Sequence, residues 1–434
     1  MAAALARGQN SRKNISARYG PVGRSPGYSC MTWRSSRTRG RRHEGRAVRN
    51  PRVVNALIPL ITVLVAFVVG GLVVLATRNN PLTVYRSLWV GAGFDWPFQY
   101  LPGNPFGVDG TLAEINLVAT IVQATPLVLT GLAVAFAFRC GLFNIGGQGQ
   151  FVAGSLAGFA VAAFVGGPLG LLVGTLAGAA GGALLGGFAG ALKAFRGAHE
   201  VITTIMLNWI AIFVGKQLTG LGGALQDASS GQPATKQLND ATQFPIFWGD
   251  IQGVHLGLLI ALAAAVVYSL VLRRTTLGFE VRAVGFNPEA ARYGGVSVRR
   301  SIMLSLAISG AFAGLAGSGE VLGVQHRLSE NEITVGQLGF TGIAVALLGR
   351  NTGIGCVLGA LLFAALDAGA RNLGGSDFSP ELARTLATII QGVIILLVGG
   401  EAIVRWIFKR RRRKATVTLP PTAASPSVEG GAAL

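Results

Sequence analysis

The sequence predicts an all-α protein, a polytopic membrane helix bundle of about ten transmembrane helices with a broken or re-entrant element near residues 141–150. Composition is the first observation: of 434 residues, 51% are hydrophobic and only 13% charged, whereas a soluble domain carries about a quarter charged residues. The second is that the apolar residues gather in runs near the 20 or so that cross a bilayer as a helix. The third is that both terminal tails are basic.

The net charge of +19 is concentrated in these tails. Residues 1–52 contain thirteen arginines and lysines and few apolar side chains, so we expect a basic, disordered cytoplasmic tail. Residues 53–408 form the predicted transmembrane domain, and 409–434 form a second basic, low-complexity cytoplasmic tail. The tails contain no recognisable nucleic-acid module, so we expect them to meet anionic lipid of the bilayer and expect no nucleic acid as partner.

The order of the spans follows from the apolar runs and the loop charges. The first run has no cleavage site and is read as a retained helix. The predicted spans are 57–77, 117–138, 144–166, 168–192, 201–218, 254–272, 301–322, 336–348, 352–369 and 382–404. The intervals 78–116 and 219–253 are nearly neutral and are assigned outside. Because both tails are basic, an even number of spans is required, which places both termini in the cytoplasm of a multi-pass cell-membrane protein.

The fourth span carries glycine at every fourth residue from Gly166 to Gly190. Such a strip lets two helix backbones come into van der Waals contact, which in lipid replaces the missing hydrophobic drive. We expect a tight packing face, and its residues are Gly170, Gly174, Gly178, Gly182 and Gly186.

The entry to the third span, GLFNIGGQGQ, is too polar and glycine-rich for a lipid-facing helix. Such backbone is tolerated at membrane depth only where protein or a water-filled cavity covers it. Amides are the main polar groups inside the spans, and the candidates for a solute pathway are Gln123, Asn144, Gln148 and Asn208. Each has an alternative reading as an interhelical hydrogen bond that serves packing. Asp367 and Arg371, four residues apart, can pair on one helix face.

The interval 273–300 is a strongly cationic loop between two spans and is therefore assigned to the cytoplasm. Asn287 suits a helix N-cap, Pro288 the first helical position, Glu289 the first turn, and Gly294 and Gly295 the end. One short helix, 288–293, is predicted. Taken alone, it is also consistent with an ordinary connector.

The sequence contains no catalytic or metal-binding constellation that holds together. The four histidines lie in different segments, and no lysine is followed by Ser or Thr, so there is no phosphate-binding loop. We therefore predict a chain that is not an enzyme and binds no cofactor; if ATP is used, another polypeptide hydrolyses it.

Three motifs resemble one family. GFNPEAARYGGV is similar to the coupling segment of ABC-importer permeases, GLFNIGGQGQFVAG resembles a signature of the branched-chain amino acid, simple-sugar and nucleoside permeases, and FRGAHEVITTIMLNWIA is most similar to the nucleoside and simple-sugar branch. The resemblance covers about residues 56–408.

It implies an alternating-access permease that takes up a small polar solute. The implied partners are two ATPase subunits or a fused ATPase, a second permease subunit, and an extracytoplasmic binding protein or lipoprotein. ATP would be used by those partners. The ATPase-coupling residues implied by the resemblance are Asn287, Glu289, Ala290, Ala291, Arg292, Gly294 and Gly295.

Two alternatives stay open at the level of sequence. A self-contained, ion-coupled secondary transporter is the main one, although such carriers usually place ionisable groups deep inside their spans. A membrane scaffold without transport is disfavoured by the polar entry at 141–150. Apolar walls with amides suit a nucleoside or a sugar, and an amino acid remains an option.

Overall fold

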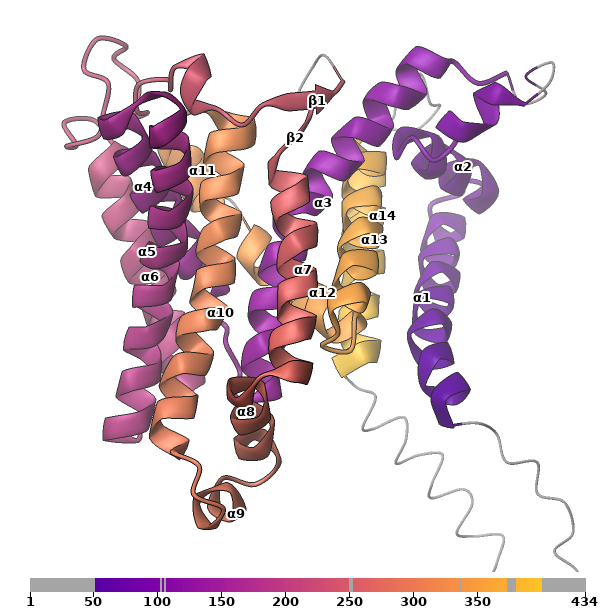
Figure 1. Ribbon diagram of the computed structural model, residues 1–434. Coiled ribbons are helices and arrows are strands. Elements are labelled where there is room, and N and C mark those ends of the chain that lie inside the picture. Colours follow the sequence, from indigo (N-terminus) through magenta and orange to yellow (C-terminus); the bar gives the residue numbers. More distant parts are fainter. Residues whose placement is uncertain are drawn as a thin grey trace, which may run out of the picture. The chain divides into compact units, whose positions relative to one another are not determined.

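The computed structural model describes residues 51–399 except 102–103, 105–106, 250–252, 336 and 373–379. The predicted all-α membrane bundle is confirmed (Figure 1). The only sheet in the described part of the chain is a two-stranded antiparallel pair, β1 (Ile246–Trp248) with β2 (Val254–His255). Apart from Pro51 and Arg52, which begin the first helix, the two predicted tails lie outside the described residues.

The helices follow the predicted order. They are α1 (Pro51–Ala76), α2 (Pro81–Gly91), η1 (Trp96–Tyr100), α3 (Gly110–Arg139), α4 (Gly147–Val165), α5 (Gly167–Arg196), α6 (Glu200–Thr219), η2 (Asp240–Thr242), α7 (Gly257–Arg274), α8 (Thr276–Phe286), α9 (Pro288–Tyr293), α10 (Val298–Glu320), η3 (Val321–Gln325), α11 (Glu330–Val335), α12 (Leu338–Leu348), α13 (Gly353–Arg371) and α14 (Pro380–Gly399). Among the described residues, nine helical stretches are long and apolar enough to cross a membrane, and a shorter apolar stretch in α14 accompanies them. The protein is thus a multi-pass membrane protein.

The structure differs from the sequence prediction where local caps extend the helices. Asp109 caps α3, because its Oδ1 accepts hydrogen bonds from Thr111 N (3.1 Å) and Leu112 N (3.2 Å), so α3 begins seven residues before the predicted span. Asn80 caps α2 in the same way, inside the interval 78–116, where no helix was predicted.

The prediction of one helix in the interval 273–300 was incomplete, because the structure has two. Thr275 caps α8 by accepting a hydrogen bond from Gly278 N at 3.1 Å. Gly278, Val281 and Val284 recur every third residue and bury one face of this helix. The charged residues between them concealed that face in the sequence. The second helix, α9, has the predicted bounds.

The glycine strip of α5 is buried, as predicted, and it serves two neighbours. A Cβ at Gly170 or Gly174 would overlap atoms of α4, whereas one at Gly182 or Gly186 would overlap the backbone of α10. A four-residue spacing advances about 40° beyond a full turn at each step, so the strip winds around α5 from one neighbour to the other. Figure 1 shows α4, α5 and α10 packed side by side.

Helix α3 is the central element of the bundle. In its apolar 18-residue stretch 83% of residues are buried, the largest share among the candidate spans of the described chain. It packs against α7, α10, α12 and α13.

Candidate functional site

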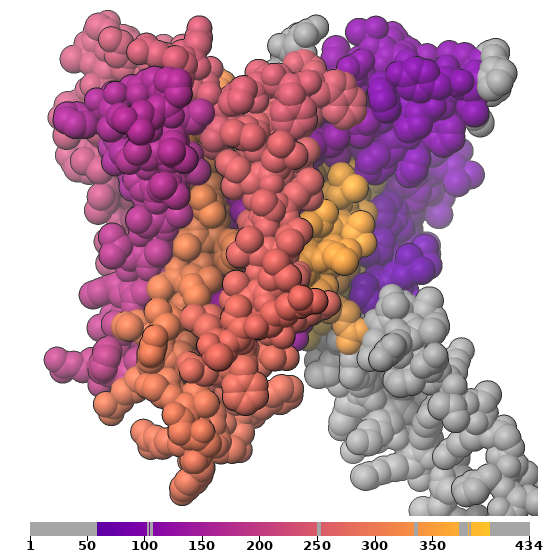
Figure 2. Space-filling model, viewed as in Figure 1, coloured from indigo at the N-terminus to yellow at the C-terminus, as the bar shows by residue number. Residues whose placement is uncertain are grey.

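The segment α8–α9 projects from one end of the bundle beyond the neighbouring helices (Figures 1 and 2). Asn287 is the N-cap of α9, since its Oδ1 accepts hydrogen bonds from Glu289 N (2.9 Å) and Ala290 N (3.1 Å). Gly295 ends the helix with a φ of +82°, a conformation that favours glycine. Both features agree with the sequence prediction.

An apolar groove of about 270 Å³ lies between α8 and α9. Ala290 and Gly294 line it from α9, and Phe279 and Phe286 line it from α8. Phe286 is 92% exposed, and Tyr293 nearby on α9 is 94% exposed. Large aromatic side chains this exposed on a segment outside the spans are typical of a protein-binding surface.

The other side of the segment is anchored to α3. Gly285, near the end of α8, lies so close to the Arg139 carbonyl that a Cβ would overlap it. The Arg139 guanidinium donates to Asn351 O from Nε (3.0 Å) and Nη2 (2.6 Å), and the Tyr268 hydroxyl donates to the same oxygen (2.8 Å). The end of α3 is therefore tied to α7 and to the turn between α12 and α13.

Directly after this anchor the chain is not helical from residue 140 to 146, which confirms the predicted break near 141–150. Helix resumes at Gly147, so the last four residues of the predicted interval are helical. Asn144 is fully buried in this break. Its Nδ2 donates to Gln150 Oε1 (2.8 Å) and to Ser309 Oγ of α10 (2.7 Å), and its Oδ1 accepts from Gly146 N. Protein covers the part of the break around Asn144 and Gly146, as irregular backbone inside a membrane bundle requires, whereas Gly141 and Phe143 are exposed.

Two further predicted pathway residues hold the same break. Asn208 of α6 donates to Ile145 O (2.9 Å) and accepts from Gly149 N (2.8 Å). Gln148 accepts from Gly339 N of α12 at 2.9 Å. The structure thus brings Asn144, Gln148 and Asn208 together, and in this conformation their polar atoms bond to protein groups. Their role in a solute pathway stays a prediction.

Gln123, the fourth predicted residue, lies on α3 and away from the other three. Its Nε2 donates to Asp367 Oδ2 at 3.2 Å. The predicted pairing of Asp367 with Arg371 is confirmed at 3.1 Å. The sequence could not have indicated the contact with α3, because 244 residues separate Gln123 from Asp367.

A second polar site, which the sequence did not reveal, lies between α3, α5, α7 and α10. Thr125, Thr175, His255 and Glu320 line a cavity of about 10 Å³, which admits about one water molecule. His255 stacks on Phe244, and its Nδ1 accepts from Gly257 N at 3.1 Å, which leaves Nε2 buried without a protein partner. The pKa of His255 is lowered to about 4, chiefly by burial and to a smaller extent by the nearby His326.

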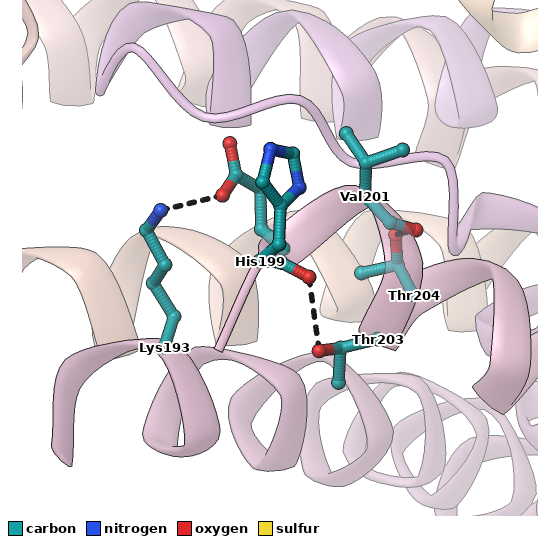
Figure 3. Close-up of polar contacts among 6 residues, drawn as sticks. Lys193, His199, Val201, Thr203 and Thr204 are labelled. Atoms are coloured by element: carbon teal, nitrogen blue, oxygen red, sulfur yellow. Dashed lines mark hydrogen bonds and ion pairs between the residues drawn. The ribbon is translucent and has the colours of Figure 1, made fainter. Parts of the chain in front are cut away.

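The turn between α5 and α6 belongs to the third sequence motif. Lys193 Nζ and Glu200 Oε2 form an ion pair of 2.6 Å across it (Figure 3). In the same view Thr203 Oγ1 donates to the His199 carbonyl at 3.0 Å. These contacts fix the turn, and nothing in their geometry suggests catalysis. Within the described residues no cluster of three or more His, Cys, Asp or Glu side chains could hold a metal ion.

Comparison with known proteins gives a consistent result. Residues 116–399 match the family model described as branched-chain amino acid transport system / permease component. The chain is 38% identical to the guanosine ABC transporter permease protein NupP of Bacillus subtilis, over 84% of this chain and 98% of that protein.

Two other relatives are similar over most of their length. The nucleoside ABC transporter permease protein NupB of Lactococcus lactis is 34% identical, over 82% of this chain and 93% of its own. The glucose ABC transporter permease protein TsgB13 of Haloferax volcanii is also 34% identical, over 82% and 88%. No solved structure matches the chain.

Proposed function

The chain belongs to the permease family of the branched-chain amino acid transport system, and from this premise we propose that it is the membrane subunit of an ABC importer that takes up a nucleoside or a simple sugar by alternating access. Its partners are two ATPase subunits or a fused ATPase, a second permease subunit, and an extracytoplasmic binding protein or lipoprotein. The chain itself is not catalytic and holds no cofactor. Both of its termini lie in the cytoplasm.

The observation that carries the proposal is the α8–α9 segment. A short capped helix stands at one end of the bundle. No described residue covers the groove beside it or its exposed aromatic side chains. Arginines flank it at Arg273, Arg274, Arg299 and Arg300, which favours the cytoplasmic side. The face of α9 that carries Ala290 and Gly294 lines the groove, so we assign this face to the ATPase contact.

The same geometry suggests how ATP binding drives transport. A displacement of α9 moves α8, and Gly285 transmits the movement to the end of α3 because no side chain cushions their contact. The break at 140–146 follows immediately, and Asn144 links it to α10 through Ser309. A push at the ATPase is thereby converted into a movement of α3 against α10. The packed bundle responds by switching between two arrangements rather than by bending.

A nucleoside or sugar is the proposed solute for two reasons. The three relatives named above are described as permeases for guanosine, nucleosides and glucose. The polar groups in the interior of the described spans are mainly amides and hydroxyls, which suit neutral polar rings.

Reconstitution tests the proposal. The chain, its ATPase, the second permease and the binding protein are placed in proteoliposomes with labelled guanosine or glucose. We expect uptake that requires ATP and the binding protein, and we expect Glu289→Trp to leave ATP hydrolysis intact while abolishing uptake. Uptake by the purified chain alone, driven by a proton or sodium gradient, would instead establish an ion-coupled carrier.

A further inference from the structure

An ion pair on α13 lies in an unusual environment. The side chains of Asp367 and Arg371 are each 45% exposed, although the residues on both sides of Asp367, Leu366 and Ala368, are buried. Ionisable side chains within spans are costly unless they face a bundle interior or a water-filled cavity. The side of α13 on which the pair lies therefore decides whether its exposed atoms meet lipid or the interior of the bundle.

The pair faces the protein and not the lipid. Leu358, which is 62% exposed, marks the apolar outer face of α13, and nine residues separate it from Asp367, which places the two about 180° apart on the helix. Asp367 accepts a hydrogen bond from Gln123 of α3, the most buried span of the described chain. The exposed carboxylate of Asp367 therefore lies beside its contact with α3.

The two charges of this pair offset each other. The Arg371 Nη2 and Asp367 Oδ2 atoms are 3.1 Å apart and form an ion pair. A zwitterionic amino acid would need a free cation for its carboxylate and a free anion for its ammonium group, whereas here the opposite charges already face each other. A neutral solute that offers adjacent hydroxyl donors fits better, because an ionised carboxylate is acceptor-only and can take two of them.

We propose that Gln123, Asp367 and Arg371 form a solute-binding site between α3 and α13 that recognises the vicinal diol of a ribose or a sugar. The Asp367 carboxylate accepts the two hydroxyl hydrogens, Gln123 supplies an amide donor and acceptor beside it, and Arg371 orients the carboxylate through the ion pair. The inference rests on the proposed function, since it names the chemistry by which the permease would receive its solute.

Cysteine protection tests this site in the complete transporter complex. Gln123→Cys is made in a chain whose Cys30 is replaced by serine; Cys140 and Cys356 are buried. A membrane-impermeant maleimide is applied from outside, without ATP. We expect guanosine and glucose to slow the labelling, 2′,3′-dideoxyguanosine to slow it much less, and leucine to have no effect. The protection given by guanosine, compared with that given by glucose, shows which diol-bearing solute the site prefers.

Controls separate a binding site from a structural effect. Leu112→Cys, exposed on the same face of α3 eleven residues earlier, reports labelling outside the site and should show no protection. Adding Asp367→Asn should raise the guanosine concentration that gives half-protection at position 123 about tenfold, as for loss of a charged hydrogen bond. Glu330→Gln, in the similarly exposed ion pair Lys216–Glu330 (3.0 Å), should leave it unchanged.

Unprotected labelling at position 123 in a complex whose parent imports guanosine with ATP would overturn the site and leave the proposed function standing. Equal protection by guanosine and by its dideoxy form would overturn the diol chemistry. Failure of the parent complex to import any of these solutes, with maleimide protection intact, would refute the proposed function and not the site.

Discussion

Gly285 of α8 lies directly against the main-chain carbonyl of Arg139 at the end of α3, with no room between them for a single carbon atom. This contact joins the projecting segment to the central helix of the bundle. It also lies one residue before the break at 140–146. The segments that carry the motifs GFNPEAARYGGV and GLFNIGGQGQFVAG therefore lie next to each other in the structure.

Gly285→Ala should uncouple the transporter. The added methyl group must displace either α8 or the turn at Arg139, and overpacking at such a site typically costs about 1–3 kcal/mol. We expect the assembled complex to hydrolyse ATP at a rate within about twofold of the parent, while uptake per ATP falls severalfold. Vesicle uptake and phosphate release, measured in the same preparation, check this.

Gly392→Ala on α14 is the matched control, because a Cβ there meets no atom within 4 Å. It should leave the ratio of uptake to hydrolysis unchanged. An unchanged ratio in Gly285→Ala, at normal expression, would show that the contact does not transmit movement.

The glycine strip leads to a second prediction, on stability. A Cβ at Gly182 would overlap the Gly310 carbonyl, whereas one at Gly187, on the same helix but off the strip, would meet only Ala307 Cβ at an ordinary 3.4 Å. Gly182→Ala should therefore destabilise the bundle by about 1–3 kcal/mol, and Gly187→Ala should be neutral or slightly stabilising because alanine favours helix. Thermal unfolding in detergent, measured side by side, separates the two. Equal midpoints would contradict a packing role for the strip.

Much of the fold could be predicted because its signals are local. The apolar runs located the spans, and the caps at Asn287 and Gly295 gave the bounds of α9. Helix α8 was missed because its buried face, Gly278, Val281 and Val284, alternates with charged residues. Only tertiary contacts, such as that of Gly278 with Leu272 of α7, show which face is buried.

The candidate site was predicted less completely, for the same reason. The amides could be selected by residue type, and three of the four do meet at one place. Their partners could not be selected, since Gln123 meets Asp367 and Asn144 meets Ser309 only through the packing of helices far apart in the chain. His255 and Glu320 carried no local signal at all, because neither belongs to a motif.

The N-cap of α9 gives a third prediction. Asn287→Ala removes the acceptor for Glu289 N and Ala290 N, a loss of about 1 kcal/mol. In a six-residue helix this is enough to increase fraying, so the amides of residues 289–293 should exchange hydrogen faster and uptake should fall. Asn287→Asp retains the acceptor and should preserve both. Exchange rates that are equal in the alanine and aspartate variants would show that the cap is dispensable.

The last prediction concerns acid. The pKa of His255 is about 4 in the folded protein against an ordinary value of 6.5, because burial beside Phe244 and His326 disfavours the imidazolium. The unfolded chain therefore binds the proton more readily, so the stabilising contribution is fully present above pH 6.5 and is lost as the pH falls towards 4. Thermal unfolding between pH 7.5 and 4 should show a falling midpoint.

His255→Asn keeps an acceptor for Gly257 N but cannot be protonated in this range. It should lose less of its midpoint between about pH 6.5 and 4 than the parent does, even if it begins lower at neutral pH. His326 also has a lowered pKa, chiefly from burial, so its titration remains in the variant and the acid effect should shrink without vanishing. Parallel curves for parent and variant across that window would show that His255 is not the group responsible.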